Sequence, residues 1–364
     1  MRIGVLTGGG DCPGLNAVIR AVVKTAAHEY HDEVIGIRDG FSGLINNKMH
    51  PLDLTRASGL ISRGGTILGS SNRDNPFKYA EYIGGNMRDM DVSDRVIENI
   101  QKNKLDCVIV IGGDGTQSIA HQFGQKGINV IGIPKTIDND LGATEVTFGY
   151  DTAITTVMEA IDKIQTTAES HHRVMVVEVM GRDAGWIAVS AGIAGGAHII
   201  LIPEIPFNME TISQKIYERK GRGKHFTVIV VAEGAKASGG DRVIKRLVEG
   251  SFEKVRLGGI GEFVASELER ITHVEARTTV LGHIQRGGSP SAFDRILATR
   301  YGSAAVVFAH EGKFDHMVAL RTPDIVAVPL SEALHKMKNV EPNGSHVTTA
   351  RRIGISFGDE TAPE

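Results

Sequence analysis

Short runs of β-branched residues recur along the chain and alternate with helix-like segments. The runs are Arg2–Thr7, Asp106–Ile111, Asn129–Ile133, Arg173–Val179, His198–Ile202 and Thr227–Ala232. The segments with helical character are Asn16–Glu29, Thr116–Gln125, Ala153–Thr167 and Met209–Lys220. Strands that are apolar almost throughout are buried on both faces, as in parallel sheets. The alternation therefore predicts an α/β protein with doubly wound, mainly parallel sheets.

Length and charge narrow the class of protein. The 364 residues suffice for two lobes with buried cores, and a boundary is expected near Gly149–Tyr150, where a loop ends and a helix begins. The formal net charge of −3 gives no reason to expect binding to nucleic acid or to an anionic membrane. No stretch reaches the ~18 apolar residues of a membrane span. Two cysteines, Cys12 and Cys107, fit a reducing, cytoplasmic setting.

Two glycine-rich segments each follow a predicted strand and precede a helix. In Thr7–Gly14 (TGGGDCPG), the glycines allow backbone N–H groups to approach an anion at a helix N-terminus, although a tight βα turn explains the same pattern. In Gly112–Thr116 (GGDGT), Gly113 and Gly115 expose backbone for phosphate, and Asp114 is a candidate ligand of Mg²⁺. GGDGT occurs in kinases of sugars, lipids and NAD, and a simple Gly-Asp turn is its structural alternative.

The segment Pro134–Asp140 (PKTIDND) is the most specific signal in the chain. Asp138 and Asp140 lie two residues apart, so both would face the same side of an extended segment. One carboxylate can take a proton from an attacking hydroxyl while the other orders metal or substrate. Together with GGDGT, the segment indicates a Mg²⁺-dependent phosphoryl-transfer site.

Basic residues gather at the ends of later strands. They are Arg173, Arg182, Arg277, His283 and Arg286. Each taken alone fits a surface salt bridge, but the set favours a phosphorylated substrate. Glu233, which follows the run Thr227–Ala232, is placed to accept hydrogen bonds from sugar hydroxyls, with a helix cap or a surface acid as its alternative.

These segments together resemble the 6-phosphofructokinase family. GVLTGGGDCPGLNAVIR, RGGTILGSSNR, VIGGDGT, PKTIDND, SHHRVMVVEVMGRDAGW and VLGHIQRGGSP stand in the order typical of that family, and the resemblance covers roughly Met1–Leu330. NAD and lipid kinases share GGDGT but lack the combination of PKTIDND, MGR and GHIQRGG. A paralogue without catalysis would lose the base or the phosphate-binding arginines, and all of these are present here.

The resemblance implies a role for each matching residue. Asp138 would deprotonate the sugar 1-hydroxyl, with Thr136 and Asp140 in support, and Arg182 would stabilise the transferring phosphoryl group. The residues implied to hold the donor and Mg²⁺ are Gly10, Arg73, Gly113, Asp114, Gly115, Thr116 and Lys135. Met180, Gly181 and Glu233 would contact the sugar. His283 and Arg286 would hold its 6-phosphate, with Arg173 and Arg277 reaching in from a neighbouring subunit.

The resemblance also implies an architecture and an assembly. A larger donor-binding lobe would comprise 1–149 and about 285–335, a smaller sugar-phosphate lobe about 150–284 and 336–353, with 354–364 as a C-terminal tail. The expected substrates are fructose 6-phosphate and ATP with Mg²⁺, and the expected assembly is a homotetramer. The segment Lys78–Val92 is longer than in the shortest bacterial members and has no implied role.

The phosphoryl donor depends on two positions. ATP-using members usually have glycine at the position of Gly115 and often at that of Lys135, whereas pyrophosphate users typically have aspartate and lysine. This chain combines Gly115 with Lys135. An aspartate at the position of Gly115 would put a side chain and a negative charge into the space of the nucleotide α-phosphate. Glycine leaves that space open and therefore favours ATP, with pyrophosphate as the alternative donor.

Overall fold

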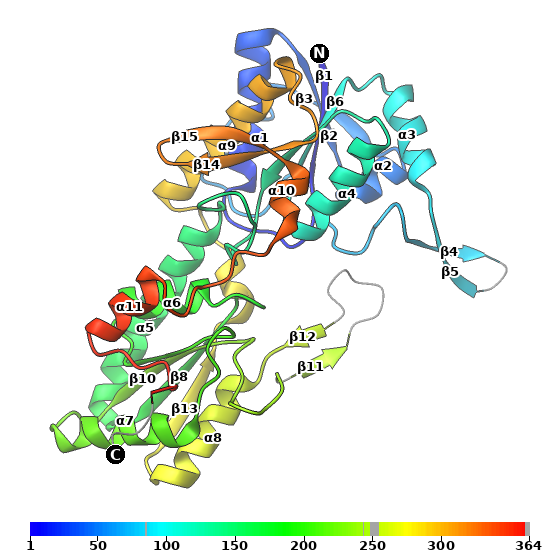
Figure 1. The fold of residues 1–364 in the computed structure, drawn as a ribbon. Coiled ribbons are helices and arrows are strands. Elements are labelled where there is room, and N and C mark those ends of the chain that lie inside the picture. The colour runs from blue at the N-terminus through cyan, green and yellow to red at the C-terminus, as the bar shows by residue number, and fades with distance from the viewer. Residues whose placement is uncertain (84–85, 243, 248–254, 361–364) are drawn as a thin grey trace.

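The computed structural model describes residues 1–83, 86–242, 244–247 and 255–360, and it has two lobes, each built on its own sheet (Figure 1). The predicted α/β class is confirmed, and the predicted strands and helices form with shifts of a few residues at their ends. One shift concerns the site: α4 (Asp114–Gln125) begins at Asp114, so GGDGT enters the helix two residues earlier than expected.

The larger sheet has seven strands in the order β15-β14-β7-β6-β1-β2-β3. Their bounds are β1 (Arg2–Thr7), β2 (Glu33–Ile37), β3 (Met49–Leu52), β6 (Cys107–Gly112), β7 (Val130–Pro134), β14 (His316–Arg321) and β15 (Asp324–Pro329). The five central strands are parallel, and β3 and β15 run antiparallel at the two edges. Because parallel strands end at one edge, the loops after β1, β6 and β7 lie together.

Helices cover both faces of this sheet, as in a doubly wound fold. The helices of this lobe are α1 (Leu15–Thr25), the π-helix η1 (Ala26–Tyr30), α2 (Phe41–Ile45), α3 (Ser93–Lys102), α4, α9 (Ala292–His310) and α10 (Leu330–His335). Along β6, Ile109 and Ile111 pack into the core that contains α1 and α9. Val108 and Val110 point the other way, toward the core formed with α2, α3 and α4. The β-period of two therefore explains why the apolar run is buried throughout.

The smaller sheet has four parallel strands in the order β13-β8-β10-β9. The strands are β8 (Val174–Val179), β9 (Ile199–Leu201), β10 (Thr227–Ala232) and β13 (Ala276–Val280). The helices of this lobe are α5 (Tyr150–His171), α6 (Trp186–Ala194), α7 (Met209–Gly221), α8 (Ile260–Thr272), the 3₁₀-helix η2 (Gly282–Arg286) and α11 (Ser345–Arg352). Val176 packs with α7 and α8, whereas Val177 belongs to the same continuous core as α1 and α9 of the larger lobe. One apolar core thus joins the two lobes.

Three segments belong to neither the larger sheet nor the smaller sheet: two hairpins and the C-terminal end. The hairpins β4 (Tyr79–Ile83)–β5 (Asn86–Met90) and β11 (Ile244–Leu247)–β12 (Val255–Leu257) extend from the same side of the molecule (Figure 1). The first accounts for most of the long segment 78–92. At the C-terminal end, Phe357 is buried and Ser356 forms a bridge with Ile199, so 355–360 packs on the smaller sheet, where the sequence suggested a tail. Residues 361–364 of that tail lie outside the described residues. No helix within the described ranges is long and apolar enough to cross a membrane.

Candidate active site

Three loops meet at the carboxyl edge of the larger sheet. The loop after β1 is joined to β6 by a hydrogen bond from Gly8 N to Ile111 O (2.9 Å), and the loop after β7 is joined to it by one from Lys135 N to Gly112 O (3.0 Å). Ligands of open α/β sheets bind at this edge. TGGGDCPG, GGDGT and PKTIDND therefore form one continuous surface.

The glycines of two of these loops are required by a neighbouring side chain. A Cβ added to Gly8 would lie 2.7 Å from Cγ2 of Thr116, and one added to Gly112 would lie 2.3 Å from it. Thr116, in the first turn of α4, is itself buried. Close packing of the helix start against both loops thus explains Gly8 and Gly112, independently of any ligand.

A cavity of about 290 Å³, here called the donor cavity, opens above these loops. The site residues expected for the donor that line it are Gly10, Gly113, Asp114, Gly115, Thr116 and Lys135, together with Thr136, Asp138, Asp140, Arg182 and Arg286. The N-terminus of α4 points its first N–H groups toward this space, since the helix starts at Asp114. A helix N-terminus beside glycine backbone favours the binding of phosphate.

A second cavity of about 240 Å³, here called the sugar cavity, adjoins the first. It is lined by Gly10, Asp11, Asn72, Asp138, Met180, Arg182, Glu233, Leu257, His283 and Arg286. Five of these residues, Gly10, Asn72, Asp138, Arg182 and Arg286, also line the donor cavity. A carboxylate and two guanidinium groups therefore stand where the two cavities meet.

The PKTIDND segment reaches this junction by a bend and not by an extended strand. Asn139 has φ 53°, in the left-handed region, and its Oδ1 accepts a hydrogen bond from Thr147 N (3.1 Å). Asp138 N donates to Thr136 Oγ1 (3.0 Å), and Thr147 Oγ1 donates to Thr136 O (2.7 Å). Asp138 and Asp140 do face one cavity, as expected, but the assumed extended geometry was wrong: the turn at Asn139 brings them there.

Burial and mutual repulsion perturb the acids of the site. The pKa of Asp140 is raised, first by burial and then by the charge of Asp138. The pKa of Glu233 is raised to about 7 by the same two causes in the same order. Burial also raises the pKa of Asp114, opposed by Arg182. Acids gathered in this way store repulsion that a bound cation relieves, which is a common property of functional sites.

A tight turn after β8 carries Arg182 to the junction. Gly181 has φ 132° and Arg182 has φ 53°. Arg182 N donates to Glu233 Oε1 (3.3 Å), and a Cβ added to Gly234 would lie 1.9 Å from Arg182 O. The turn is thus held against the loop after β10. Met180 and Arg182 line the cavities, whereas Gly181 does not appear in either lining and acts through its backbone conformation.

Two cations flank the glycine loop of β1 from opposite lobes. Lys135 is buried, which lowers its pKa, and its ammonium donates to Gly10 O. Arg286, from η2, donates through Nη1 to Asp11 O (3.2 Å). A Cβ added to Gly10 would lie 2.8 Å from the same Nη1, so a larger residue there would displace the guanidinium. The loop is therefore fixed between a lysine of the larger lobe and an arginine of the smaller one.

Four predicted residues lie outside both linings, namely Gly181 and three arginines. Arg73 is exposed, on the loop that contributes Asn72 in its place. Arg173 and Arg277 both bind Glu275, the former at 2.7 Å. Arg173 precedes β8 and Arg277 pairs with Met175 near the start of that strand. They therefore occupy the amino edge of the smaller sheet, about 20 Å from the edge that carries Met180, at 3.3 Å per strand residue.

Several lining residues escaped the sequence analysis. Asp11, Asn72 and Asp183 directly adjoin motif residues, and the polar character of TGGGDCPG and GSSNR was the available signal. Met337 lines the donor cavity from a segment almost 200 residues after PKTIDND, and nothing in the local sequence of that segment indicates this position.

Comparisons with known proteins identify the family of the chain. The profile of the phosphofructokinase family matches residues 2–309. The chain is 54% identical over 360 residues to ATP-dependent 6-phosphofructokinase 2 of Clostridium perfringens, covering 98% of each chain. It is 49% identical over 359 residues to pyrophosphate–fructose 6-phosphate 1-phosphotransferase of Streptomyces coelicolor, covering 98% of this chain and 100% of the other. The crystal structure of Pichia pastoris phosphofructokinase in the T-state is similar with a TM-score of 0.80 and 30% identity, covering 92% of this chain and 35% of that chain. The chain belongs to the phosphofructokinase family.

Proposed function

We propose that the protein transfers the γ-phosphoryl group of ATP to the 1-hydroxyl of fructose 6-phosphate, giving fructose 1,6-bisphosphate and ADP. The observation that carries this proposal is the meeting of two cavities at Asp138 and Arg182. One cavity has glycine backbone and a helix N-terminus suited to phosphates, and the other has the acid Glu233 and the hydrogen-bond donors His283 and Arg286 suited to a sugar phosphate.

Asp138 is the general base in this proposal. It takes the proton of the sugar 1-hydroxyl as that oxygen forms a bond to the γ-phosphorus, while the bond from phosphorus to the ADP oxygen breaks. Its backbone N–H is bound to Thr136 Oγ1, which supports the position of the carboxylate. Asp140 lines the donor cavity but not the sugar cavity, so it supports Asp138 from the donor side.

Arg182 stabilises the charge of the phosphoryl group in transit. Its guanidinium lies at the wall shared by the two cavities, and charge on the transferring group is spread over the equatorial oxygens. Gly10, Gly113, Gly115 and Thr116 offer backbone or hydroxyl contacts to the donor phosphates. The contribution of Arg73 to the donor rests on the family resemblance, because this exposed residue does not line the cavity.

The donor cavity also fits a divalent cation. Asp114 and Asp140 line it beside Asp138, and the raised pKa values of the first two reflect burial, with repulsion from Asp138 adding for Asp140. Among the described residues no group of three acids, histidines or cysteines is close enough to hold a metal by itself. Mg²⁺ typically uses one or two carboxylates together with substrate phosphates. When bound, Mg²⁺ would neutralise donor phosphate charge, with Asp114 as its proposed ligand.

ATP is the proposed donor, and pyrophosphate is the second candidate. Gly115 lines the donor cavity and adds no acid to it. The ammonium of Lys135 is bound to Gly10 O under the glycine loop, so its charge supports either donor from below. Relatives of similar identity carry both donor names, which keeps the second candidate open to test. Steady-state assays with each donor decide: turnover with pyrophosphate and none with ATP would reverse the assignment.

The neighbouring subunit is proposed to complete the sugar-phosphate site. Arg173 and Arg277 lie at the edge of the smaller sheet that is remote from both cavities of their own chain. This placement supports a homo-oligomer, a tetramer in our proposal, in which these arginines reach the 6-phosphate of the adjacent chain.

A further inference from the structure

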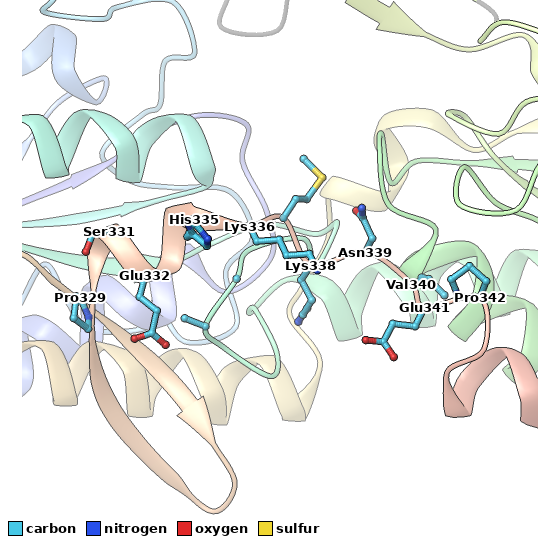
Figure 2. Close-up of a pocket in the computed structure, with 13 residues that line it drawn as sticks. Pro329, Ser331, Glu332, His335, Lys336, Lys338, Asn339, Val340, Glu341 and Pro342 are labelled. Carbon is cyan, nitrogen blue, oxygen red and sulfur yellow. The ribbon is translucent and has the colours of Figure 1, made fainter.

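A segment that follows α10 crosses from the larger lobe to the smaller one beside the active site. We call residues 336–344 the crossing segment. It forms one wall of a third cavity, of about 920 Å³, whose lining includes Lys336, Met337, Lys338 and Glu341 (Figure 2). Met337 also lines the donor cavity, so the segment separates the two spaces. The contacts that the side chains of this segment make can therefore affect the active site.

Lys338 uses its ammonium to hold the loop that follows Asp138. Nζ lies 2.8 Å from Asn139 Oδ1, 2.7 Å from Glu145 O and 3.2 Å from Thr144 O. A lysine has three donors, and each has an acceptor here. Figure 2 shows this side chain extending from the crossing segment toward that loop. Asn139 belongs to PKTIDND, and Thr144 and Glu145 belong to the loop that continues it.

The backbone of Lys338 ties the same loop to the smaller lobe. Lys338 N donates to Asp140 O (2.8 Å), and Trp186 Nε1, at the start of α6, donates to Lys338 O (2.7 Å). The ammonium also lies 5.7 Å from the centre of the Trp186 ring, within the range of a cation–π interaction. One residue thus contacts both the catalytic loop and the lobe that supplies Arg182.

We propose that Lys338 is a positioning residue that fixes the turn at Asn139 and thereby holds Asp138 and Asp140 toward the donor cavity. The inference rests on the proposed function of that site. Asn139 has φ 53°, a conformation that costs a non-glycine residue free energy and persists where neighbouring contacts offset that cost. Its Oδ1 accepts hydrogen bonds from Lys338 Nζ and from Thr147 N, and these two hydrogen bonds fix the turn.

Electrostatics support this geometry. Burial lowers the pKa of Lys338 to about 8, and the charges of Asp140 and Glu145 oppose that shift. Burying an ammonium group costs free energy unless it makes its hydrogen bonds, and removing it would leave the oxygen atoms that accept those bonds without a donor. The side chain is thus anchored to the loop.

A second anchor holds the crossing segment independently. Glu204 accepts hydrogen bonds from Val340 N (2.9 Å) and from Gly185 N (3.0 Å). Removing the ammonium of Lys338 therefore leaves the segment attached to the smaller lobe. A replacement at Lys338 tests the turn at Asn139 more than the attachment of the segment.

The test compares Lys338→Met with Lys336→Met, an exposed lysine two residues earlier on the same segment. We expect Lys338→Met to lower kcat by about ten- to a hundredfold with both KM values changed less than threefold, because a small misplacement of reacting groups costs rate. Lys336→Met stays within about twofold of wild type. The amide of Thr147 exchanges at least about tenfold faster in Lys338→Met, since its local opening becomes easier.

Further variants show whether the loss of kcat in Lys338→Met comes from the turn at Asn139. Asn139→Ala lowers kcat as well, and adding it to Lys338→Met produces little further loss, because both changes release one turn. Independent, multiplying losses would overturn the proposal, as would a Lys338→Met kcat within twofold of wild type or equal losses in the two lysine variants. If Lys338→Met does not fold, Lys338→Gln takes its place. Wild-type turnover is measured first, so that failure of the proposed activity is seen separately, and the exchange measurement needs no turnover.

Discussion

The donor cavity and the sugar cavity differ in how each is built. Most of the donor cavity consists of loops at one edge of one sheet, joined by backbone hydrogen bonds such as Gly8 N to Ile111 O. The sugar cavity takes Gly10 and Asp11 from the larger lobe but Met180 and Glu233 from the smaller lobe. The first is thus largely a property of the larger sheet, whereas the second exists only where the lobes meet.

The smaller sheet extends this contrast to its two edges. Its carboxyl edge supplies Met180 and Glu233 to the sugar cavity, while its amino edge carries Arg173 and Arg277 paired with Glu275. In the proposed enzyme the donor site is complete in one chain and the sugar-phosphate site needs another. Changes at the shared wall should therefore act on the transfer between the two substrates, and changes at the amino edge should act only on the binding of the sugar phosphate.

Replacing Asp138 by Asn should have the largest effect, because this residue lies at the wall shared by the cavities. Loss of the base should lower kcat by about 10³-fold, while both substrates still bind. Steady-state kinetics give kcat, and calorimetry gives the affinity for fructose 6-phosphate. The variant should melt no lower than wild type, since one buried charge beside Asp140 is removed. A kcat near that of wild type would exclude Asp138 as the base.

Arg277→Ala separates the two sites. Loss of one arginine–phosphate contact should raise KM for fructose 6-phosphate by about ten- to a hundredfold and leave KM for ATP nearly unchanged. The control is Arg270→Ala, an exposed arginine of α8 that pairs with Glu267. Equal increases of KM for both substrates would contradict the division of the sites.

A mixture of chains shows whether that arginine acts on a neighbouring subunit. At a fructose 6-phosphate concentration well below the KM of the Arg277→Ala variant, the Arg277→Ala and Asp138→Asn chains each have low activity alone. In hybrid oligomers some sites combine an intact Asp138 with an intact Arg277 from the other chain, so activity should reappear on co-refolding. Mixtures no more active than the sum of their parts would mean that both residues serve their own chain.

The donor side of the site was largely predictable from sequence. Each of its motifs follows a recognisable strand, and carboxyl ends of parallel strands share an edge, so Gly113, Asp114 and Asp138 had to lie close together. The same rule places Arg173 at the opposite edge, because it precedes its strand. Its distance from the cavities of its own chain therefore follows from the sequence.

Other features depended on tertiary contacts. The bend at Asn139 is stabilised by Thr147 and by Lys338, and a partner about 200 residues away leaves no local pattern. Motif assignment also gave Arg73 a place in the cavity wall that Asn72 occupies, because a loop fixes side-chain direction only after it packs.

Gly115→Asp probes the donor cavity alone. A further acid beside Asp114, Asp138 and Asp140 would repel nucleotide phosphates, so kcat/KM for ATP should fall by about tenfold, with KM for fructose 6-phosphate little changed. Gln125→Asp, exposed at the other end of α4 and about 15 Å away, adds the same charge as a control. A gain of turnover with pyrophosphate would show that this position selects the donor, whereas unchanged use of ATP would show that it does not.

The smallest expected effect is the pH dependence that Glu233 gives to the sugar cavity. Its pKa is raised to about 7, first by burial and then by the charge of Asp138. An acid with a raised pKa is neutral below that value, so Glu233 is a carboxylate at pH 8 and protonated at pH 6. Because a carboxylate accepts stronger hydrogen bonds from hydroxyls, KM for fructose 6-phosphate should rise a few-fold as the pH falls from 8 to 6. The substrate phosphate titrates near pH 6 as well, and Glu233→Gln removes the contribution of Glu233 alone. In that variant KM should vary less with pH, whereas the wild-type profile retained in full would place the titration elsewhere.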